Sequence, residues 1–140
     1  MSWLTITAGC SRVIVLLTDA DKLIGHIAAY IRQVRLCDEA VKIGLIGGIV
    51  VDPNFRSRGY SKRLLQEAHD IFIEANLPFS VLVAYEPERY RTAGYQLMNN
   101  EMRFLEDGEW RQLVYRGGMV AELSERKWPN GLLHLRGPVV

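Results

Sequence analysis

The sequence predicts an α/β (α+β) fold in which helices flank a mixed central β-sheet. Extended, β-prone runs occupy residues 12–18 and 23–36, on either side of a polar turn. Residues 61–75 instead repeat their apolar side chains at helical spacing, and residues 79–85 return to an extended apolar run. Because 140 residues is the length of one domain, we expect residues 1–140 to form a single domain.

The first two extended runs form a predicted hairpin. Residues 12–18, RVIVLLT, are rich in β-branched and apolar side chains. Residues 19–22, DADK, supply the turn, and the second run, residues 23–36, then lies antiparallel to the first.

A third strand is predicted at residues 41–51, VKIGLIGGIVV, after the polar break at residues 37–40. Its side chains are apolar at nearly every position, as in a strand that is covered on both faces. We therefore place it at the centre of the sheet. Pro53 ends it, because proline cannot donate to a ladder and holds its predecessor extended.

From Ser61 the sequence takes on a helical period, which predicts an amphipathic helix packed on the sheet. His69 falls on its polar side and is expected to be solvated. The extended run FSVLVAY, residues 79–85, is a fourth strand, parallel to the third because a helix separates them. The apolar positions of the helix are Leu64, Leu65, Ala68, Ile71, Phe72 and Ala75.

From residue 87 onward the sequence predicts a short helix, a pair of antiparallel strands and a loop-like tail. Residues 87–93 form the polar helix, which ends at Gly94 in a left-handed cap. Residues 95–107 and 109–116 form the antiparallel pair. The tail, residues 127–140, is loop-like, with the extended stretch GLLHLRG.

Composition excludes several classes of function. The net charge is +1, whereas domains that bind nucleic acid through bulk charge carry a marked basic excess, so we expect no nucleic-acid partner. Cys10 and Cys37 form neither a CxxC pair nor a cluster with histidine, which predicts no metal site and reduced, cytoplasmic thiols. The N-terminus lacks a basic leader and charges interrupt residues 13–31, so neither a secretion signal nor a membrane segment is predicted.

The candidate functional segment is VDPNFRSRGYSKRLL, residues 51–65, which joins the third strand to the helix. Unpaired N–H groups of a first helical turn, together with the helix dipole, stabilise a phosphate by about 0.3–2 kcal/mol. Gly59 allows close backbone approach or a positive φ, and Arg56 and Arg58 offer charge-assisted donors. Alternatively, these are solvated arginines beside an ordinary turn. The sequence contains neither GxxxxGK[ST] nor GxGxxG, so an NTP or NAD site is not predicted.

This segment resembles the acetyl-CoA motif of the GNAT acyltransferases, which is [RQ]xxGx[GA] between a strand ending in VxP and a long helix. Arg56, Gly59 and Ser61 stand at its three marked positions, and Ser61 replaces the usual glycine or alanine.

A second stretch, PERYRTAGYQL, is similar to another landmark of the GNAT family, a short helix that ends in tyrosine before a glycine and an aromatic residue. Tyr90, Gly94 and Tyr95 match that pattern. The resemblance covers residues 12–97, and two landmarks around a βαβ unit are more specific than either alone.

The resemblance implies acetyl-CoA as a co-substrate. The third strand and its parallel neighbour would splay apart, and the pantetheine arm would pair with the backbone of Ile49, Val50 and Val51. Gly47 and Gly48 suit this approach, since glycine in a strand marks a bulge or a close contact; alternatively they make room for an aromatic side chain. The pyrophosphate would be held by backbone N–H groups from Arg56, Ser57, Arg58, Gly59, Tyr60 and Ser61.

The resemblance also implies an N-acetyltransferase, in which an amine attacks the thioester directly and CoA leaves as a thiolate. A backbone N–H near Ile49 or Val50 would stabilise the oxyanion, and Tyr90 would protonate the leaving sulfur. A phenol of pKa about 10 protonates a thiolate of reference pKa about 8.5 only where its position narrows that gap. Alternatively, Tyr90 packs at the end of its helix.

The general base is not identified by the sequence. GNAT members often carry a glutamate in the third strand, whereas residues 43–51 contain no carboxylate. The tail, residues 128–140, loosely resembles the C-terminal end of aminoglycoside N-acetyltransferases, and His134 within it is unassigned. The alternatives are water, Tyr85, Glu86, His26 or the terminal carboxylate.

The short segment before Arg12 bears on the oligomeric state and on the acceptor site. Few residues precede Arg12, so the strand and helix that normally open this fold are expected to be largely missing, which predicts an open acceptor site and a homodimer or higher oligomer. The acceptor is an amine of a small molecule or of a protein. The alternative function is an acyl-CoA-binding or assembly module of the same fold with little catalysis. Acidic residues after the fourth strand attract a cationic acceptor or form a solvated face: Glu86, Glu88, Glu101, Glu106, Asp107 and Glu109.

Overall fold

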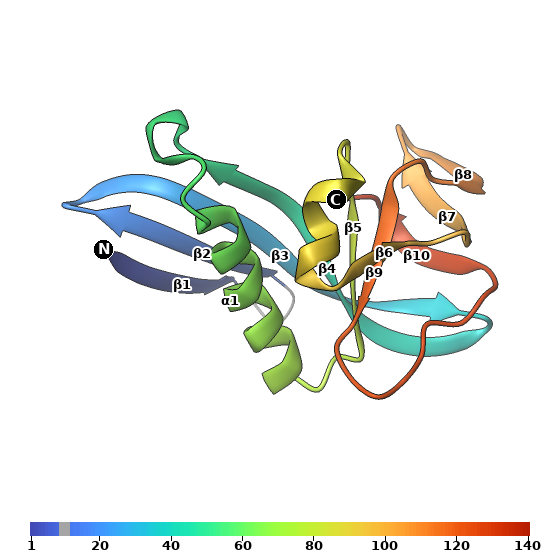
Figure 1. Ribbon diagram of the computed structural model, residues 1–140. Coiled ribbons are helices and arrows are strands. Elements are labelled where there is room, and N and C mark those ends of the chain that lie inside the picture. The colour runs from blue at the N-terminus through green and yellow to red at the C-terminus, as the bar shows by residue number, and fades with distance from the viewer. Residues whose placement is uncertain (9–11) are drawn as a thin grey trace.

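The computed structural model describes residues 1–8 and 12–140. In these ranges the chain forms a curled β-sheet, the helix α1 (Tyr60–Glu74) and the short 3-10 helices η1 (Pro53–Phe55) and η2 (Pro87–Ala93) (Figure 1). The strands are β1 (Ser2–Ala8), β2 (Arg12–Asp19), β3 (Lys22–Leu36), β4 (Glu39–Val51), β5 (Phe79–Val83), β6 (Tyr95–Leu97), β7 (Glu101–Glu106), β8 (Glu109–Val114), β9 (Gly118–Glu122) and β10 (Leu133–Pro138).

The sheet follows the order β6-β9-β5-β4-β3-β10-β7-β8, and β2 and β1 extend it beside β3. Strand β3 is 15 residues long and belongs to both halves of the sheet. Its first part pairs antiparallel with β2, and its last residues, Arg35 and Leu36, pair with β10. The sheet therefore curls, with β1 and β2 at one end and β7 and β8 at the other (Figure 1). The predicted hairpin of residues 12–36 is confirmed.

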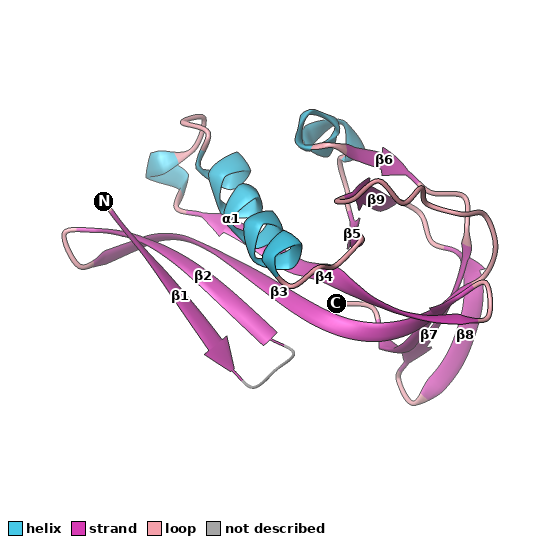
Figure 2. Ribbon diagram, turned by 90° about the horizontal axis from the view of Figure 1, so that it is seen from below, coloured by secondary structure: helices cyan, strands magenta, loops and turns pink. Residues whose placement is uncertain are grey.

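The predicted βαβ unit is also confirmed, because β4 and β5 are parallel on either side of α1 in the chain. Their register joins Gly44 to Ser80 and Leu45 to Val81 and ends there, so the two strands diverge along the rest of β4. Helix α1 packs on this unit with the ring of Phe72 against Gly44, where a Cβ would collide with the ring. Figure 2 shows α1 and η2 on the same side of the sheet.

Strand β4 contains a β-bulge at Gly47, where the register changes from Ala28 and Gly48 to Ala29 and Ile46. The ring of Tyr30 fills the space beside Gly47, since a Cβ there would lie 2.6 Å from the Tyr30 Cε2. The Cβ position of Gly48 meets no described atom within 4 Å. Gly47 thus serves both a bulge and an aromatic neighbour, and Gly48 leaves the strand open to approach.

Two apolar cores hold the fold together. The first lies between α1 and the sheet and contains Leu17, Ile27, Leu64 and Phe72. The second is enclosed by the curled half of the sheet and contains Ile43, Phe79, Phe104 and Leu133. At about 25 cal/mol for each Å² of apolar surface removed from water, such burial is the main stabilising contribution to the fold.

The predicted continuous strand at residues 95–107 is wrong. β6 ends at Leu97, the N–H of Met98 then donates to the carbonyl of Gly118, and β7 begins at Glu101. β6 pairs instead with β9, a strand for which the sequence gives no local signal. The antiparallel pair is confirmed for β7 and β8 alone.

The tail agrees with expectation, whereas the N-terminus differs from it. The expected extended stretch of the tail, residues 131–137, overlaps β10, which inserts between the end of β3 and β7, antiparallel to β3 and parallel to β7. Residues 2–8 form β1, which pairs with β2 along its whole length. The opening strand of the fold is therefore present, and only residues 9–11 separate it from β2.

Candidate active site

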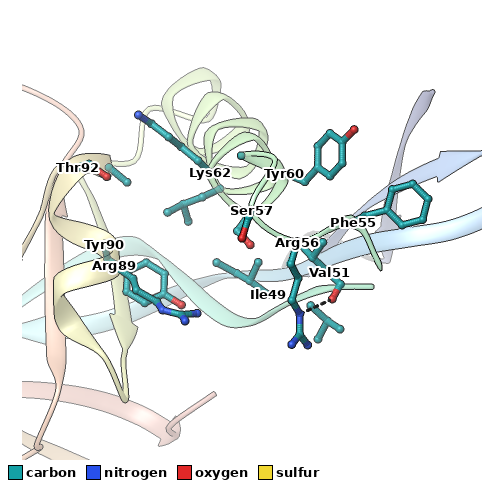
Figure 3. Close-up of a pocket in the computed structure, with 15 residues that line it drawn as sticks. Ile49, Val51, Phe55, Arg56, Ser57, Tyr60, Lys62, Arg89, Tyr90 and Thr92 are labelled. Carbon is teal, nitrogen blue, oxygen red and sulfur yellow. Dashed lines mark hydrogen bonds between the residues drawn. The ribbon is translucent and has the colours of Figure 1, made fainter. Parts of the chain in front are cut away.

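A cavity of about 630 Å³ opens where β4 and β5 diverge, between the start of α1 and η2 (Figure 3). This volume lies within the range of small-molecule sites. Most of the residues predicted for the cofactor come together here, and Tyr90 faces them. The lining residues are Ile49, Val50, Val51, Phe55, Arg56, Ser57, Gly59, Tyr60, Ser61, Lys62, Leu65, Arg89, Tyr90, Thr92 and Ala93.

The loop before α1 presents backbone N–H groups to this cavity. Ser57 has φ +63° and Gly59 has φ +79°, a left-handed conformation that costs little for glycine and about 1–2 kcal/mol for other residues. Gly59 is the N-cap of α1 and makes no side-chain cap, and the first turn contains no acidic residue. The first helical bond runs from the N–H of Arg63 to the carbonyl of Gly59, so the N–H groups of residues 60–62 are available to a ligand.

Basic side chains surround the same turn but differ in where they point. The Nε of Arg56 donates to the Val51 carbonyl at 3.3 Å, which draws the guanidinium across the end of β4 (Figure 3). Arg58 lies outside the cavity lining, with its guanidinium 5.2 Å from the centroid of the Phe55 ring. Lys62 and Arg89 line opposite walls, and Arg89 is paired at 2.6 Å with Glu86.

The open edge of β4 forms the floor of the cavity. In an antiparallel ladder, alternate residues turn their backbone groups toward the partner strand and the others turn away. The N–H of Asp52 donates to Ile24 of β3 at 2.8 Å, so the N–H of Val50 also faces β3. The N–H groups of Ile49 and Val51 therefore face the other edge, from which β5 has diverged.

Tyr90 stands on η2, which ends at Gly94 with φ +92° as the sequence predicted. Figure 3 shows its ring pointing into the cavity toward Ile49. The edge of the Tyr90 ring contacts the ring of Tyr95, with 6.3 Å between centroids and 77° between planes. A phenol is thus placed beside the floor of the cavity, across from the first turn of α1.

The side chains considered as bases lie elsewhere. A Cβ on Gly25 would contact Leu64 of α1, so the next residue, His26, projects from the opposite face of the sheet. Tyr85 is fully exposed, and Glu86 is paired with Arg89. Within residues 1–8 and 12–140, no aspartate, glutamate or histidine lines the cavity.

The predicted solvation of His69 is wrong. His69 is 5% exposed, and its Nε2 lies 2.7 Å from the Tyr95 hydroxyl, which in turn lies 2.6 Å from the Ser80 Oγ. Burial lowers the pKa of His69, although the neighbouring Asp70 charge opposes this shift. Burial also raises the pKa of Tyr95, against the effect of its hydrogen bond with Ser80. The helical period did not predict the burial of His69. A histidine beside an apolar stripe is assigned to the polar face of a helix, because the sequence does not show the hydrogen-bond partner that allows its burial.

The remaining candidates fall outside the cavity. His134 lies on β10, where its ring contacts Trp110 and its Nδ1 accepts from the Arg136 N–H. Val139 and Val140 pack against the second core. The acidic residues are spread over η2 and the β7–β8 hairpin, where Glu86, Glu88 and Glu106 are paired with exposed arginines.

The sequence predicts no metal site, reduced thiols and no membrane segment. In the part of the chain that the structure describes, no three metal-ligating side chains cluster, and no helix has the length and apolarity to span a membrane. Cys37 is exposed, and its Sγ donates to the Asn130 carbonyl. Cys10 lies outside the described residues.

The family model for the GNAT acetyltransferase domain matches residues 7–98. Similar solved structures include the GNAT family N-acetyltransferase YhbS from Escherichia coli in complex with CoA, with a TM-score of 0.67, 20% identity, and coverage of 88% of this chain and 66% of that one. A GNAT family acetyltransferase from Brucella melitensis in complex with acetyl-CoA has a TM-score of 0.61 and 16% identity, with coverage of 86% of this chain and 64% of that one. An aminoglycoside 6'-N-acetyltransferase from Acinetobacter haemolyticus has a TM-score of 0.56 and 20% identity, with coverage of 76% of this chain and 69% of that one.

This likeness confirms the predicted fold. At identities of 16–20% it extends to the fold alone and does not carry over a substrate. This chain spans slightly less than two thirds of the length of the first two proteins.

Proposed function

This chain belongs to the GNAT acetyltransferase family, and we propose that it transfers an acetyl group from acetyl-CoA to a primary amine of a small molecule or of a protein. The observation that carries the proposal is the cavity itself. It joins the uncapped first turn of α1, the unpaired edge of β4 and the Tyr90 phenol within one space.

The two ends of acetyl-CoA fit different parts of this cavity. The pyrophosphate would accept hydrogen bonds from the backbone of residues 56–61, where positive φ values at Ser57 and Gly59 curl the chain around an anion. The pantetheine arm would pair with the open edge of β4 at Ile49 and Val51, in the position that β5 would occupy had the ladder continued. The Val51 carbonyl, which accepts a hydrogen bond from the Arg56 Nε, would then accept one from the pantetheine arm instead.

Acetyl transfer on this framework needs few side chains. A neutral amine attacks the acetyl carbonyl carbon, a C–N bond forms, and the carbonyl oxygen takes the negative charge. The N–H of Ile49 faces the open edge and is the better oxyanion donor of the two residues considered, since that of Val50 faces β3. As the C–S bond breaks, the Tyr90 hydroxyl protonates the leaving thiolate. The proton released from the nitrogen passes to water, because no carboxylate among the described residues lines the cavity.

The test is calorimetric titration with acetyl-CoA, followed by thiol release from acetyl-CoA with a panel of amines. We expect micromolar binding, about −8 kcal/mol, and amine-dependent thiol release. Binding without release under any amine would reject acetyl transfer. No binding would reject both the transfer and the cofactor site.

One observation favours the alternative function, an acyl-CoA-binding or assembly module. The lining of the cavity lacks a general base within the described ranges. The amine panel separates the two functions, because such a module binds acetyl-CoA and releases no thiol.

We also propose that two copies associate through β1. Strand β1 pairs with β2 on one side, and among residues 1–8 and 12–140 no strand pairs with its other side. It carries no charge that would discourage pairing, and Leu4 and Ile6 are 52% and 43% exposed on one of its faces. Light scattering at micromolar concentration should give a dimer that Ile6→Lys converts to a monomer. A monomeric mass for the native chain would reject this assembly.

A further inference from the structure

A buried polar network lies beside the cavity and has no role in the proposed chemistry. The hydroxyl of Tyr95 lies 2.7 Å from the Nε2 of His69 and 2.6 Å from the Oγ of Ser80. The exposed fractions of Tyr95, His69 and Ser80 are 3%, 5% and 0%. Such groups are tolerated in a core only when each has a partner, so the hydroxyl fixes all three side chains relative to one another.

The network connects the two walls of the cavity. His69 lies on α1, whose first turn forms one wall, and Tyr95 begins β6 directly after η2, which forms the other. Ser80 lies on β5, two strands away from Tyr95. The strand between them is β9, where Ala121 pairs with both residues. Because alanine is small, the Tyr95 side chain can pass over it to reach Ser80 and His69.

Tyr95 also contacts Tyr90, the proposed acid. The two rings meet edge to face, with centroids 6.3 Å apart. Tyr90 lies on the cavity side of Tyr95, and the network lies on the core side. Any shift of the Tyr95 ring would therefore move the surface on which the Tyr90 ring rests.

We infer that the Tyr95 hydroxyl is a positioning group, which through His69 and Ser80 sets the separation between Tyr90 on η2 and the first turn of α1. The inference rests on the proposed function, in which Tyr90 is the acid and α1 holds the pyrophosphate. Tyr95 itself does not reach the reacting atoms. A misplacement of about 1 Å can reduce a reaction rate by on the order of 10²-fold, so a group that fixes this separation affects turnover.

The experiment compares Tyr95→Phe, which removes the hydroxyl alone, with the native chain and with Tyr90→Phe. We expect kcat to fall at least about tenfold in Tyr95→Phe, while the Kd for acetyl-CoA changes by less than about threefold, because the cradle on α1 is retained. In the Tyr90→Phe background, the further loss from Tyr95→Phe should shrink to less than about threefold, since the acid that it positions is gone. Equal losses in the two backgrounds would overturn the inference.

Conservative and control variants keep the test decisive. His69→Gln retains a side-chain amide able to reach the Tyr95 hydroxyl and should keep most of the kcat, whereas His69→Leu should behave like Tyr95→Phe. Gln66→Ala removes an exposed 2.9 Å hydrogen bond to Asp70 on the same helix and serves as the control for loss of a bond on α1. If Tyr95→Phe does not fold, the comparison of kcat between His69→Gln and His69→Leu tests the same inference. Equal kcat values for His69→Gln and His69→Leu would overturn the inference.

A readout without turnover separates this inference from the proposed function. The N–H of Arg89 donates to the Glu86 carbonyl and the N–H of Gly94 donates to the Arg91 carbonyl, both at 3.1 Å, at the two ends of η2. Amide hydrogen exchange at these two positions should accelerate at least about tenfold in Tyr95→Phe, with little change in Gln66→Ala. Unchanged exchange overturns the inference even if the chain acetylates amines. Faster exchange supports it even if acetyl-CoA does not bind.

Discussion

The Nε of Arg56 lies 3.3 Å from the carbonyl oxygen of Val51. Arg56, the first residue of the loop that is proposed to hold the pyrophosphate, therefore bonds the same edge of β4 on which the pantetheine arm is proposed to pair. This guanidinium thus lies where the two parts of the cavity that are proposed to receive the two ends of acetyl-CoA meet. Among the basic side chains around α1, Arg56 is therefore the one whose substitution best tests the proposed acetyl-CoA site.

Arg56→Ala should weaken acetyl-CoA binding by at least about tenfold, or 1.4 kcal/mol. The change removes a charge-assisted donor to the pyrophosphate. Arg56→Lys keeps the charge without the planar fork and should lie between the native chain and Arg56→Ala. Calorimetric titration measures the three affinities.

Two further variants control for charge. Arg116→Ala removes an exposed cation elsewhere on the surface, and Arg58→Ala removes the guanidinium that lies over Phe55. Arg116→Ala should leave the affinity at the native value, and Arg58→Ala should lower it less than Arg56→Ala. Equal effects of Arg56→Ala and Arg116→Ala would mean that net charge, and not the position of Arg56, governs binding.

Tyr90→Phe should lower kcat by about 10²-fold or more, as expected for loss of a general acid. The Kd for acetyl-CoA should change little, because the phenyl ring still packs against Tyr95. Steady-state thiol release and calorimetry measure the two quantities on the same preparation. An unaltered kcat would remove Tyr90 from the role of acid.

Gly44→Ala should destabilise the fold by about 1–3 kcal/mol, because a Cβ at this position collides with the Phe72 ring in the first core. Gly48→Ala is the matched control in the same strand, since its Cβ position has no described atom within 4 Å. Urea unfolding followed by circular dichroism gives both free energies. Similar losses for the two variants would contradict the packing of α1 on β4.

The stability of the fold should depend on the protonation of His69. Its native pKa lies below the ordinary value of 6.5 because burial disfavours the imidazolium, and the Asp70 charge only partly offsets this; Tyr95 and Ser80 face the ring as neutral groups. Between the native pKa and 6.5 the unfolded chain binds more protons than the native chain. The free energy of unfolding therefore falls as the pH decreases from 6.5 through the native pKa, and this contribution is fully present above 6.5.

Urea unfolding at several pH values between about 5 and 8 tests this dependence. His69→Gln removes the titrating group, so the difference in unfolding free energy between the native chain and this variant should change with pH below 6.5 and be constant above it. Parallel curves over the whole range would show that His69 does not titrate differently on folding.

Local patterns along the chain determined a large part of this protein. The alternation of extended and helical runs predicted β2, β3, β4, α1 and β5 in order, since each follows from the period of its own apolar side chains. The basic segment at residues 51–65 and Tyr90 of the short helix placed the candidate site at the start of α1. These signals are local, because a turn needs its glycine and a buried strand needs its apolar run wherever the rest of the chain lies.

Only the tertiary structure decided the rest. The sequence predicts an extended stretch in the tail, but its place as β10 between β3 and β7 depends on those two strands. β9 is a strand because β5 and β6 both pair with it. His69 is buried because Tyr95 and Ser80, distant in sequence, supply its polar partners. Arg56 and Arg58 both offer donors by charge, but Arg56 meets the open edge of β4 and Arg58 meets Phe55. Each of these outcomes depends on a partner far along the chain or on the direction of a side chain, and neither is encoded in a local period.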